Sequence, residues 1–321
     1  MPRSLKIKKN LLVVLLGGTI GSVRDEEGNV ELADRGFDAE FFEALDRRFK
    51  YKVISPVTYS SENADIGIYK KAIGGILEET GRTGASYKGI LILHGTDSMA
   101  YFAQLAVRCL SYLKIPVIIT GSKKPKNEQG TDVVKNISLS LGLLAAAIKD
   151  GSGARTFGVV FEDSYTHKST YVDSCASVNA DINGDMRSFV DRSSDESGKF
   201  SKKAKTPFAS DEYKKRTRDF IARDTGRIMV IPAIPGAYIP KDTDDCNALV
   251  IECYHSGTQD DKALLPLISS AKDRNIPVIM GPVPTKGNIY TSRRALEDAG
   301  AMVMSGFPFE GIWAEAVIDW A

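Results

Sequence analysis

The sequence predicts an α/β protein with a larger N-terminal domain built on a parallel sheet and a smaller C-terminal α/β domain. Three observations predict this class. The chain has 321 residues, enough for two domains of ordinary size. Short apolar runs alternate with helical patterns, which is typical of a parallel sheet covered by helices. The content of 43% hydrophobic and 26% charged residues is that of an ordinary globular protein and excludes global disorder.

The N-terminal strands are apolar runs rich in β-branched residues, most of which end in glycine or a polar turn. They are residues 11–16, 90–93, 117–119 and 157–161. Between the second and third runs, apolar residues recur at helical spacing over residues 99–113, and Asp97 or Ser98 is placed to cap that helix. A further helix is predicted over residues 135–149. These elements predict an N-terminal α/β domain over residues 1–190.

The composition changes after this domain. Residues 191–225 are predicted to form a surface linker, because they are polar, poor in apolar side chains and contain a short basic cluster at 202–205. Strand patterns resume at residues 228–231, 248–251 and 277–280, and helical patterns cover residues 262–274 and 310–318. These patterns predict a C-terminal α/β domain over residues 226–321.

Charge and cysteine content exclude several classes of partner. Lys and Arg total 42 against 41 Asp and Glu, so nothing electrostatic favours nucleic acid or an anionic membrane, and we expect neither partner. The four cysteines contain no C-x-x-C pair and the three histidines are scattered, so we expect no metal and no cofactor. We interpret the four cysteines as buried, reduced thiols of a cytoplasmic protein. The apolar run at 11–16 is shorter than a signal-peptide core or a membrane span.

The first strand ends in a glycine turn that carries a threonine, Gly17-Gly18-Thr19-Ile20-Gly21. The spacing does not fit a dinucleotide-binding loop, because Leu16 stands where that fingerprint needs glycine. Two glycines allow the backbone to approach a ligand closely and leave the Thr19 hydroxyl at the carboxyl end of a strand, where open α/β sheets bind ligands. The alternative interpretation is a tight turn with an incidental threonine.

A second motif, His94-Gly95-Thr96-Asp97-Ser98, follows the apolar run at 90–93. It places a second threonine and a carboxylate at another carboxyl end, beside a helix N-terminus whose free N–H groups favour negative charge. In the alternative interpretation, Asp97 only caps the helix and Thr96 only completes the turn. His94 by itself is interpreted as a hydrogen-bonded structural residue and not as a ligand.

Together these motifs make the chain resemble the bacterial-type L-asparaginase family of asparaginases and glutaminases, and most of all the cytoplasmic type I enzymes. By this resemblance, Thr19 matches the nucleophile, and Thr96 with Asp97 matches the second threonine and its aspartate. Lys168, followed five residues later by Asp173, matches the catalytic lysine.

The resemblance also extends to segments that hold the substrate. Ser60, Ser61 and Gly95 match substrate-binding positions, and the serine pair matches the segment that holds the substrate's α-carboxylate. Residues 116–122, together with Asp132 and Asn136, resemble a further family segment. The resemblance therefore covers nearly the whole chain.

The implied reaction is the hydrolysis of L-asparagine to L-aspartate and ammonia through an acyl-enzyme on Thr19. Amide hydrolysis needs an activated nucleophile, an oxyanion site and a proton for the leaving amine. Lys168 would act as the base if burial or neighbouring charges lower its pKa. Asp97 would orient Lys168 or bind the substrate's ammonium, and Thr96 would help to manage water and protons. Backbone N–H groups at the two Gly-Thr turns would bind the oxyanion.

Two positions depart from the family pattern. Many members have a tyrosine in the loop after the nucleophile, but here Asn29 stands ten residues after Thr19. Asparagine cannot supply the proton of a phenol, so Tyr290 is the candidate substitute and Tyr254 the second choice. Gln259 stands roughly where many relatives place an asparagine, which predicts altered recognition of the substrate's α-amino group.

Two other functions remain open at this stage. Asn29 favours a catalytically impaired, amino-acid-binding or regulatory protein that keeps the fold. An amide-hydrolysing subunit of a tRNA-dependent amidotransferase is a further alternative, although such subunits usually carry an extra N-terminal domain and only ten residues precede the first strand here. The resemblance implies a homodimer or homotetramer with active sites near subunit interfaces. The sequence does not decide between asparagine and glutamine as substrate.

Overall fold

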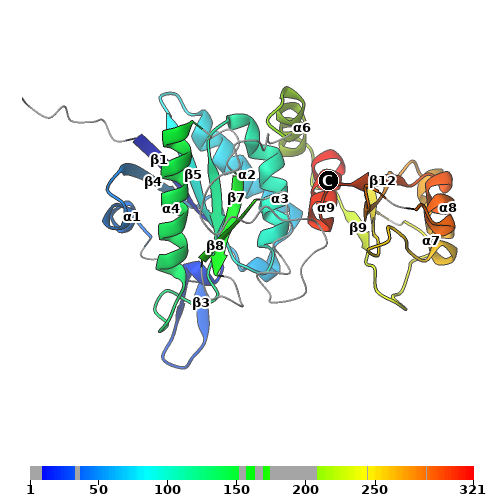
Figure 1. The fold of residues 1–321 in the computed structure, drawn as a ribbon, viewed down its shortest axis with the longest axis horizontal. Coiled ribbons are helices and arrows are strands. Elements are labelled where there is room, and N and C mark those ends of the chain that lie inside the picture. The colour runs from blue at the N-terminus through cyan, green and yellow to red at the C-terminus, as the bar shows by residue number, and fades with distance from the viewer. Residues whose placement is uncertain are drawn as a thin grey trace, which may run out of the picture. The chain divides into compact units, whose positions relative to one another are not determined.

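A computed structural model describes residues 9–32, 37–151, 157–162, 169–173, 208–243, 245–286 and 288–321 of the chain. The described residues fall into two compact units, one that extends to Lys214 and one that runs from Lys215 to Ala321. Each unit is built on its own parallel sheet (Figure 1). The predicted fold class is therefore confirmed. The predicted limits of the domains and of the linker stay predictions, because residues 191–207 lie outside the described part.

The first unit is built on a six-stranded sheet. In the order of the sheet its strands are β4 (Phe49–Ile54), β1 (Lys9–Leu15), β5 (Tyr87–Leu93), β6 (Val117–Thr120), β7 (Phe157–Glu162) and β8 (Ser169–Asp173). All neighbours pair in parallel except β7 and β8, which are antiparallel. The four strands predicted from apolar runs are confirmed as β1, β5, β6 and β7. The edge strands β4 and β8 were not predicted, because they are less uniformly apolar.

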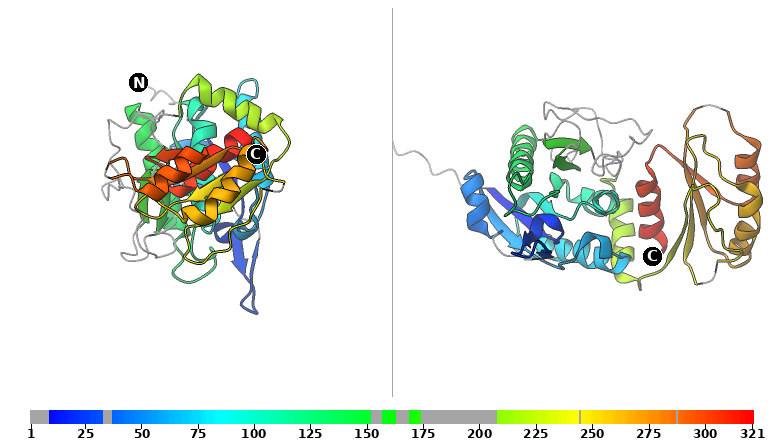
Figure 2. Two further views of the ribbon diagram at one scale, coloured as in Figure 1. Left: turned by 90° about the vertical axis from the view of Figure 1, so that its right-hand side faces the viewer. Right: turned by 90° about the horizontal axis from the view of Figure 1, so that it is seen from below.

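Helices cover both faces of this sheet (Figure 2). They are α1 (Ala39–Leu45), α2 (Ile66–Gly81), α3 (Met99–Leu110) and α4 (Val133–Asp150). One core joins Leu11 and Val13 of β1 to Phe42 of α1 and to Ile137 of α4. Because residues on both faces of β1 are buried, the strand reads as a continuous apolar run instead of an alternating one. The predicted helices over 99–113 and 135–149 are confirmed as α3 and α4.

The glycine turn after β1 leads into a short β-hairpin. Its strands are β2 (Ser22–Arg24) and β3 (Val30–Leu32), which pair antiparallel and extend away from the sheet (Figure 2). The Asp25 carboxylate closes the turn by accepting hydrogen bonds from the backbone N–H groups of Glu27 and Asn29. The residues between the two strands are polar, and the strands themselves were not predicted from the sequence.

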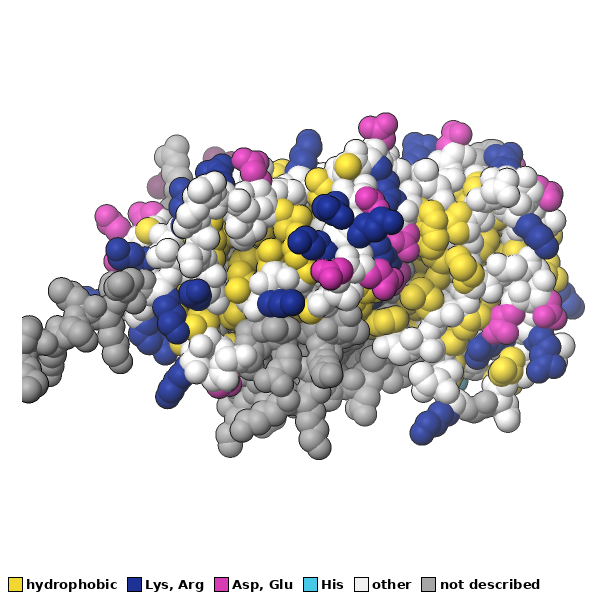
Figure 3. Space-filling view, turned by 90° about the horizontal axis from the view of Figure 1, so that it is seen from above, with side chains coloured by type: hydrophobic (Ala, Val, Ile, Leu, Met, Phe, Trp, Pro, Cys, Tyr) yellow, Lys and Arg dark blue, Asp and Glu magenta, His cyan; other side chains and the backbone are white. Residues whose placement is uncertain are grey.

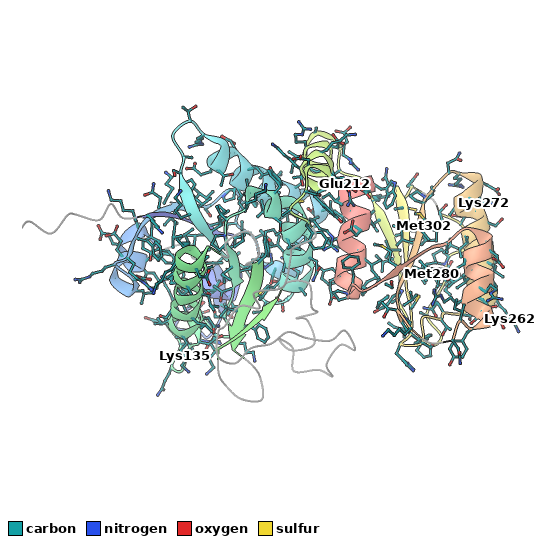
Figure 4. The ribbon with its side chains drawn as sticks, turned by 45° about the horizontal axis from the view of Figure 1, so that its top comes forward. Lys135, Glu212, Lys262, Lys272, Met280 and Met302 are labelled. Carbon is teal, nitrogen blue, oxygen red and sulfur yellow. The ribbon has the colours of Figure 1, made fainter. Side chains whose placement is uncertain are left out.

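The second unit has a four-stranded, fully parallel sheet in the order β12-β11-β10-β9. The strands are β9 (Ile228–Ile231), β10 (Ala248–Glu252), β11 (Val278–Val283) and β12 (Met302–Ser305). Helices α7 (Asp261–Asp273) and α8 (Thr291–Ala299) cover one face, and α9 (Phe309–Trp320) covers the other (Figure 2). Figure 4 shows Lys262 and Lys272 of α7 on the outside, whereas Met280 of β11 lies in the core. The predicted C-terminal strands and helices are confirmed.

The described end of the predicted linker contains a helix, α6 (Asp211–Ala222). Charged side chains of both signs gather over it (Figure 3). Arg216 donates hydrogen bonds to Asp319 and Glu315 of α9 at distances of 2.5 to 2.9 Å. Phe220 is fully buried. Low apolar content concealed this helix, because ion pairs hold it in place and few of its side chains are apolar.

Candidate active site

The turn after β1 is formed by two glycines in the left-handed region. Gly17 has a φ of 89° and Gly18 a φ of 76°. A Cβ on Gly17 would overlap the carbonyl oxygen of Tyr59, and a Cβ on Gly18 would overlap Cα of Gly95. The sequence predicts that these glycines admit a ligand. Instead the space is filled by neighbouring backbone, so their first role is to let two loops touch.

The turn of the second motif lies against the turn of the first, because Gly18 and Gly95 contact each other. Gly95 follows β5, the strand beside β1, and a Cβ on it would overlap Oγ of Ser61. The turn that carries Thr19, the Ser60–Ser61 segment and the turn that carries Thr96 therefore meet at the carboxyl edge of neighbouring parallel strands. Thr19 and Thr96 are both half-buried, and Asp97 is exposed. Such an edge is where open α/β sheets bind ligands.

Ser61 connects the Ser60–Ser61 segment to the carboxylate of the second motif. Its hydroxyl is buried and donates to Oδ2 of Asp97 at 2.8 Å. The Ser98 hydroxyl donates to the backbone carbonyl of Ser61 at 2.7 Å. Ser98 holds the N-cap position of α3 but makes no side-chain capping bond. The prediction that Asp97 or Ser98 caps this helix is confirmed for the position of Ser98, although Ser61 engages the side chains of both residues.

His94 lies behind this junction and is fully buried. Its Nδ1 is 2.6 Å from the carbonyl oxygen of Gly95, and its Nε2 is 2.7 Å from the hydroxyl of Tyr59. A carbonyl can only accept, so Nδ1 carries the proton and Nε2 accepts from Tyr59. Burial lowers the pKa of His94 to about 4, against the opposing effects of the Gly95 carbonyl and of Asp97. The interpretation of His94 as a structural residue is confirmed.

The loop after β6 approaches Thr96 from the other side. A Cβ on Gly121 would lie 3.2 Å from Cγ2 of Thr96. This loop is held by Asp132, a buried carboxylate that accepts hydrogen bonds from the backbone N–H groups of Lys123 and Lys124. Asn136 is buried beside it and donates to the Gly121 carbonyl at 2.9 Å and to Asp132 at 2.9 Å. These two residues of the predicted family segment shape the loop.

The other predicted residues have mixed outcomes. Lys168 lies outside the described residues, and Asp173 ends β8. Ser60 is half-buried at the start of a short 3-10 turn. The side-chain amide of Asn29 donates to Oδ2 of Asp25 at 3.1 Å in the exposed hairpin turn. Asn29 is thus part of the turn's own hydrogen bonding.

Three candidates belong to the second unit. Tyr290 is 55% exposed and holds the N-cap position of α8, and Tyr254 is half-buried. Gln259 is buried, and its amide donates to the carbonyls of Pro232 and Glu252. Its oxygen accepts from the N–H of Asp260. Gln259 therefore stabilises its own unit, and the expectation about α-amino recognition stays a prediction.

The hairpin after Thr19 is fixed to the loop after β6. Arg24 donates to Oε2 of Glu128 from Nε at 3.1 Å and from Nη2 at 2.8 Å. The Asn127 side chain accepts from the backbone N–H of Arg24 and donates to its carbonyl. This Arg24–Asn127–Glu128 clamp gave no signal in the sequence, because its members are about a hundred positions apart.

Metal-binding groups and membrane-spanning helices can be assessed within the described residues. There, no three or more His, Cys, Asp or Glu side chains are grouped so that they could hold a metal ion. Over the same ranges, no helix combines the length and the apolar character needed to cross a membrane. The expectations of no metal and no cofactor stay predictions.

The sequence matches the model of a known family, "Asparaginase, N-terminal", over residues 10–182, which is more than half of the chain. The chain belongs to the asparaginase family. It is 32% identical to L-asparaginase 1 of Escherichia coli over 143 residues, a match that covers 43% of this chain and 41% of that protein. It is also 26% identical to a subunit of the glutamyl-tRNA(Gln) amidotransferase of Methanobrevibacter smithii, over 98% of this chain and 72% of that protein.

Solved structures of asparaginases have the same fold as this member of the asparaginase family. A probable cytoplasmic L-asparaginase from Campylobacter jejuni superposes with a TM-score of 0.68 at 13% identity, over 97% of this chain and 94% of that one. At this level of identity the likeness concerns the fold. The chain is thus a member of the asparaginase family with a two-unit α/β fold.

Proposed function

We propose that this chain hydrolyses the side-chain amide of L-asparagine to L-aspartate and ammonia. The observation that carries the proposal is the junction of the two turns, where Gly18 and Gly95 touch and Thr19, Thr96 and Asp97 follow directly. Two hydroxyls and a carboxylate at one sheet edge form a set that amide hydrolysis requires and that simple binding does not. Membership of the asparaginase family supports the same conclusion.

In the proposed mechanism the Thr19 hydroxyl attacks the amide carbon of the substrate. Lys168 takes the hydroxyl proton, the C–N bond breaks, and ammonia leaves after receiving a proton. The product of this half-reaction is an ester between Thr19 and the aspartyl group. A water molecule, positioned by Thr96 and Asp97, then attacks the ester, which releases L-aspartate and restores the Thr19 hydroxyl. Each half-reaction is acyl transfer with an activated nucleophile.

The backbone hydrogen bonds limit which N–H groups can bind the oxyanion. The N–H of Gly18 donates to the Tyr59 carbonyl at 3.1 Å, so it is not offered to a substrate. We therefore assign the oxyanion site to the N–H groups of Thr19 and Thr96, at the threonines themselves. Ser60 would hold the substrate's α-carboxylate, and Ser61 would contribute by fixing Asp97, because its single hydroxyl proton is donated to that residue. The hydrogen bond from the Ser61 hydroxyl fixes one oxygen of the Asp97 carboxylate. The other oxygen of Asp97 would bind the substrate's ammonium.

The test is ammonia release from L-asparagine and L-glutamine by the purified chain. Thr19→Ala should lose at least about a thousandfold in kcat, because the nucleophile is removed. Thr80→Ala is the matched control, since the Thr80 hydroxyl only bonds to the carbonyls of Ile76 and Leu77 within α2. Equal turnover by wild type and Thr19→Ala would refute the nucleophile. Binding of asparagine or aspartate without turnover would favour the regulatory alternative.

A second function is favoured by one comparison. The match to the amidotransferase subunit of Methanobrevibacter smithii covers 98% of this chain, whereas the match to L-asparaginase 1 covers 43%. Such a subunit would use the same junction to release ammonia from glutamine for a partner. Turnover of free asparagine by the isolated chain supports the asparaginase. Activity that appears only with glutamyl-tRNA and a second protein would support the amidotransferase.

We further propose a homodimer or homotetramer in the cytoplasm, with active sites near subunit interfaces. Large apolar side chains at the carboxyl edge of the second unit's sheet are exposed: Ile234, Tyr238, Ile289 and Tyr290. Exposed apolar groups of this size favour burial against another surface. Among the described residues, Cys109, Cys246 and Cys253 form no disulfide bond, which supports a cytoplasmic location. Light scattering after gel filtration measures the oligomeric state.

Tyr290 remains the proposed substitute for the missing tyrosine. Tyr290→Phe should lower kcat at least about tenfold if its phenol helps to activate Thr19. Tyr238→Phe is the matched control, because Tyr238 is also an exposed tyrosine of the second unit, with 85% of its surface accessible. Unchanged kcat in Tyr290→Phe would remove this residue from the mechanism.

A further inference from the structure

Tyr59 contacts each of the three segments that meet at the junction. Its backbone N–H donates to the Leu16 carbonyl at 3.2 Å, and its own carbonyl accepts from the Gly18 N–H at 3.1 Å. These two bonds form an isolated parallel bridge to the Gly17-Gly18 turn. Tyr59 also directly precedes the Ser60–Ser61 pair. Its side-chain hydroxyl donates to Nε2 of His94 at 2.7 Å.

His94 continues this connection to the second threonine. Its Nδ1–H donates to the carbonyl of Gly95, the residue before Thr96. Its backbone N–H donates to the Thr120 carbonyl of β6 at 2.9 Å. The ring is stacked on Phe102 of α3 with 4.7 Å between ring centroids. Both ring nitrogens are therefore engaged, and packing fixes the plane of the ring.

We propose that Tyr59 and His94 are positioning residues that set the separation between the Thr19 turn and the Thr96–Asp97 turn. The proposal rests on the proposed amide hydrolysis. Tyr59 is 6% exposed and His94 is 0% exposed, so neither is placed to touch a substrate. Both act through the backbone of the turns. Nothing in the family resemblance assigned a role to Tyr59, and no sequence motif singles it out.

The direction of each hydrogen bond fixes which partner each ring nitrogen of His94 has. A neutral imidazole has one donor and one acceptor, and here the Gly95 carbonyl consumes the donor while the Tyr59 hydroxyl consumes the acceptor. A phenylalanine at position 59 would keep the aromatic packing but leave Nε2 buried without this partner. Such a loss frees the two turns to shift relative to one another, and small displacements of reacting groups lower kcat strongly.

The decisive variant is Tyr59→Phe, with Tyr51→Phe as its matched control. Tyr51 is also buried, and its hydroxyl also donates one hydrogen bond, to the Asp46 carbonyl at 3.0 Å, but it lies on β4 outside the junction. We expect Tyr59→Phe to lower kcat for asparagine at least about tenfold and to change KM by a smaller factor, because kcat depends most steeply on the separation of the reacting groups on the two turns. Tyr51→Phe should keep both constants within about twofold of wild type.

A double variant tests whether the two residues act as one unit. Tyr59→Phe combined with His94→Phe should be no more than about twofold slower than His94→Phe alone, because the shared hydrogen bond is lost only once. His94→Gln, which can still accept from Tyr59, should recover part of the activity that His94→Phe loses. A kcat for Tyr59→Phe within about twofold of wild type, or an equal loss in Tyr51→Phe, would overturn the proposal.

A readout without substrate separates this proposal from the proposed function. Amide hydrogen exchange of a peptide covering residues 94–98 should be at least about tenfold faster in Tyr59→Phe than in wild type, and unchanged in Tyr51→Phe. If the wild-type chain released no ammonia from any amide, the proposed function would fail but this comparison would still decide the role of the pair. Equal exchange in wild type and Tyr59→Phe would overturn the positioning role.

Discussion

Replacing His94 by glutamine is expected to remove one component of the acid sensitivity of the fold. The ring is surrounded by Tyr59, Tyr69 and Phe102, and the only charged side chain that acts on it among the described residues is Asp97. Burial lowers the pKa from 6.5 to about 4 in the folded chain. Between these two values the unfolded chain binds more protons than the folded chain. Stability is therefore lost as the pH falls through this window.

The magnitude follows from the two pKa values. A histidine that titrates at about 4 when folded and at about 6.5 when unfolded contributes about 3 kcal/mol in full, of which about 2 kcal/mol is lost between pH 7 and pH 5. Carboxylates also titrate in acid, but they contribute equally to wild type and variant. The difference between the two proteins isolates His94.

The assay is urea unfolding at pH 7 and pH 5, followed by circular dichroism. Trp313 and Trp320 are the two tryptophans of the chain and both belong to the second unit, so fluorescence reports that unit separately. Between the two pH values, the free energy of unfolding of wild type should fall by about 2 kcal/mol more than that of His94→Gln. This difference should appear in the unfolding of the first unit, which is followed by circular dichroism and not by tryptophan fluorescence. Equal losses in wild type and variant would refute the burial of a neutral His94.

Gly18→Ala is expected to lower the free energy of unfolding by about 3 kcal/mol or more and to abolish ammonia release, because its Cβ would overlap the neighbouring turn at a φ of 76°. Gly28→Ala, at a φ of 91° with nothing within 4 Å, should cost only about 1 kcal/mol in urea unfolding, and equal losses would contradict the steric argument. Asn127→Ala removes both side-chain bonds to the backbone of Arg24 and should speed limited proteolysis within the β2–β3 hairpin several-fold, as mapped by mass spectrometry; an unchanged cleavage rate would exclude the clamp. Arg216→Met leaves two carboxylates of α9 without their cation and should lower stability by about 2 kcal/mol, measured by tryptophan fluorescence, and a loss below about 0.5 kcal/mol would show that the pairing is negligible.

The strands buried inside the sheets and helices α3, α4, α7 and α9 were predictable because each has an apolar run or a helical repeat of its own, whereas the long helix α2 was not predicted. The runs at 11–16 and 90–93 are apolar throughout, and residues 135–149 repeat apolar side chains at helical spacing. The strands of the β2–β3 hairpin and helix α6 were missed because solvent-exposed or ion-paired elements lack that signal. The capping prediction placed Ser98 correctly but not the bonding of its side chain, because Ser61, which engages it, is more than thirty positions away.

The candidate site was predictable only in part. Thr19, Thr96 and Asp97 were found as short motifs after two strands, and the structure brings their turns into contact through Gly18 and Gly95. The position of Lys168 relative to them stays a prediction. The family could also be inferred from these motifs, because it depends on residue types within short segments and on the order of these segments along the chain.

The sequence alone determined the α/β class, the two motifs and the family. Strand patterns, glycine turns and motif spacing depend on residues that are neighbours in the sequence. Only the tertiary structure decided that the glycines before Thr19 meet neighbouring backbone, and that Tyr59 joins the Thr19 turn to His94. Both outcomes depend on strands β1 and β5 lying side by side although their sequences are separated by about seventy residues. Local pattern carries no information about a hydrogen bond or an overlap that arises only when distant segments pack against each other.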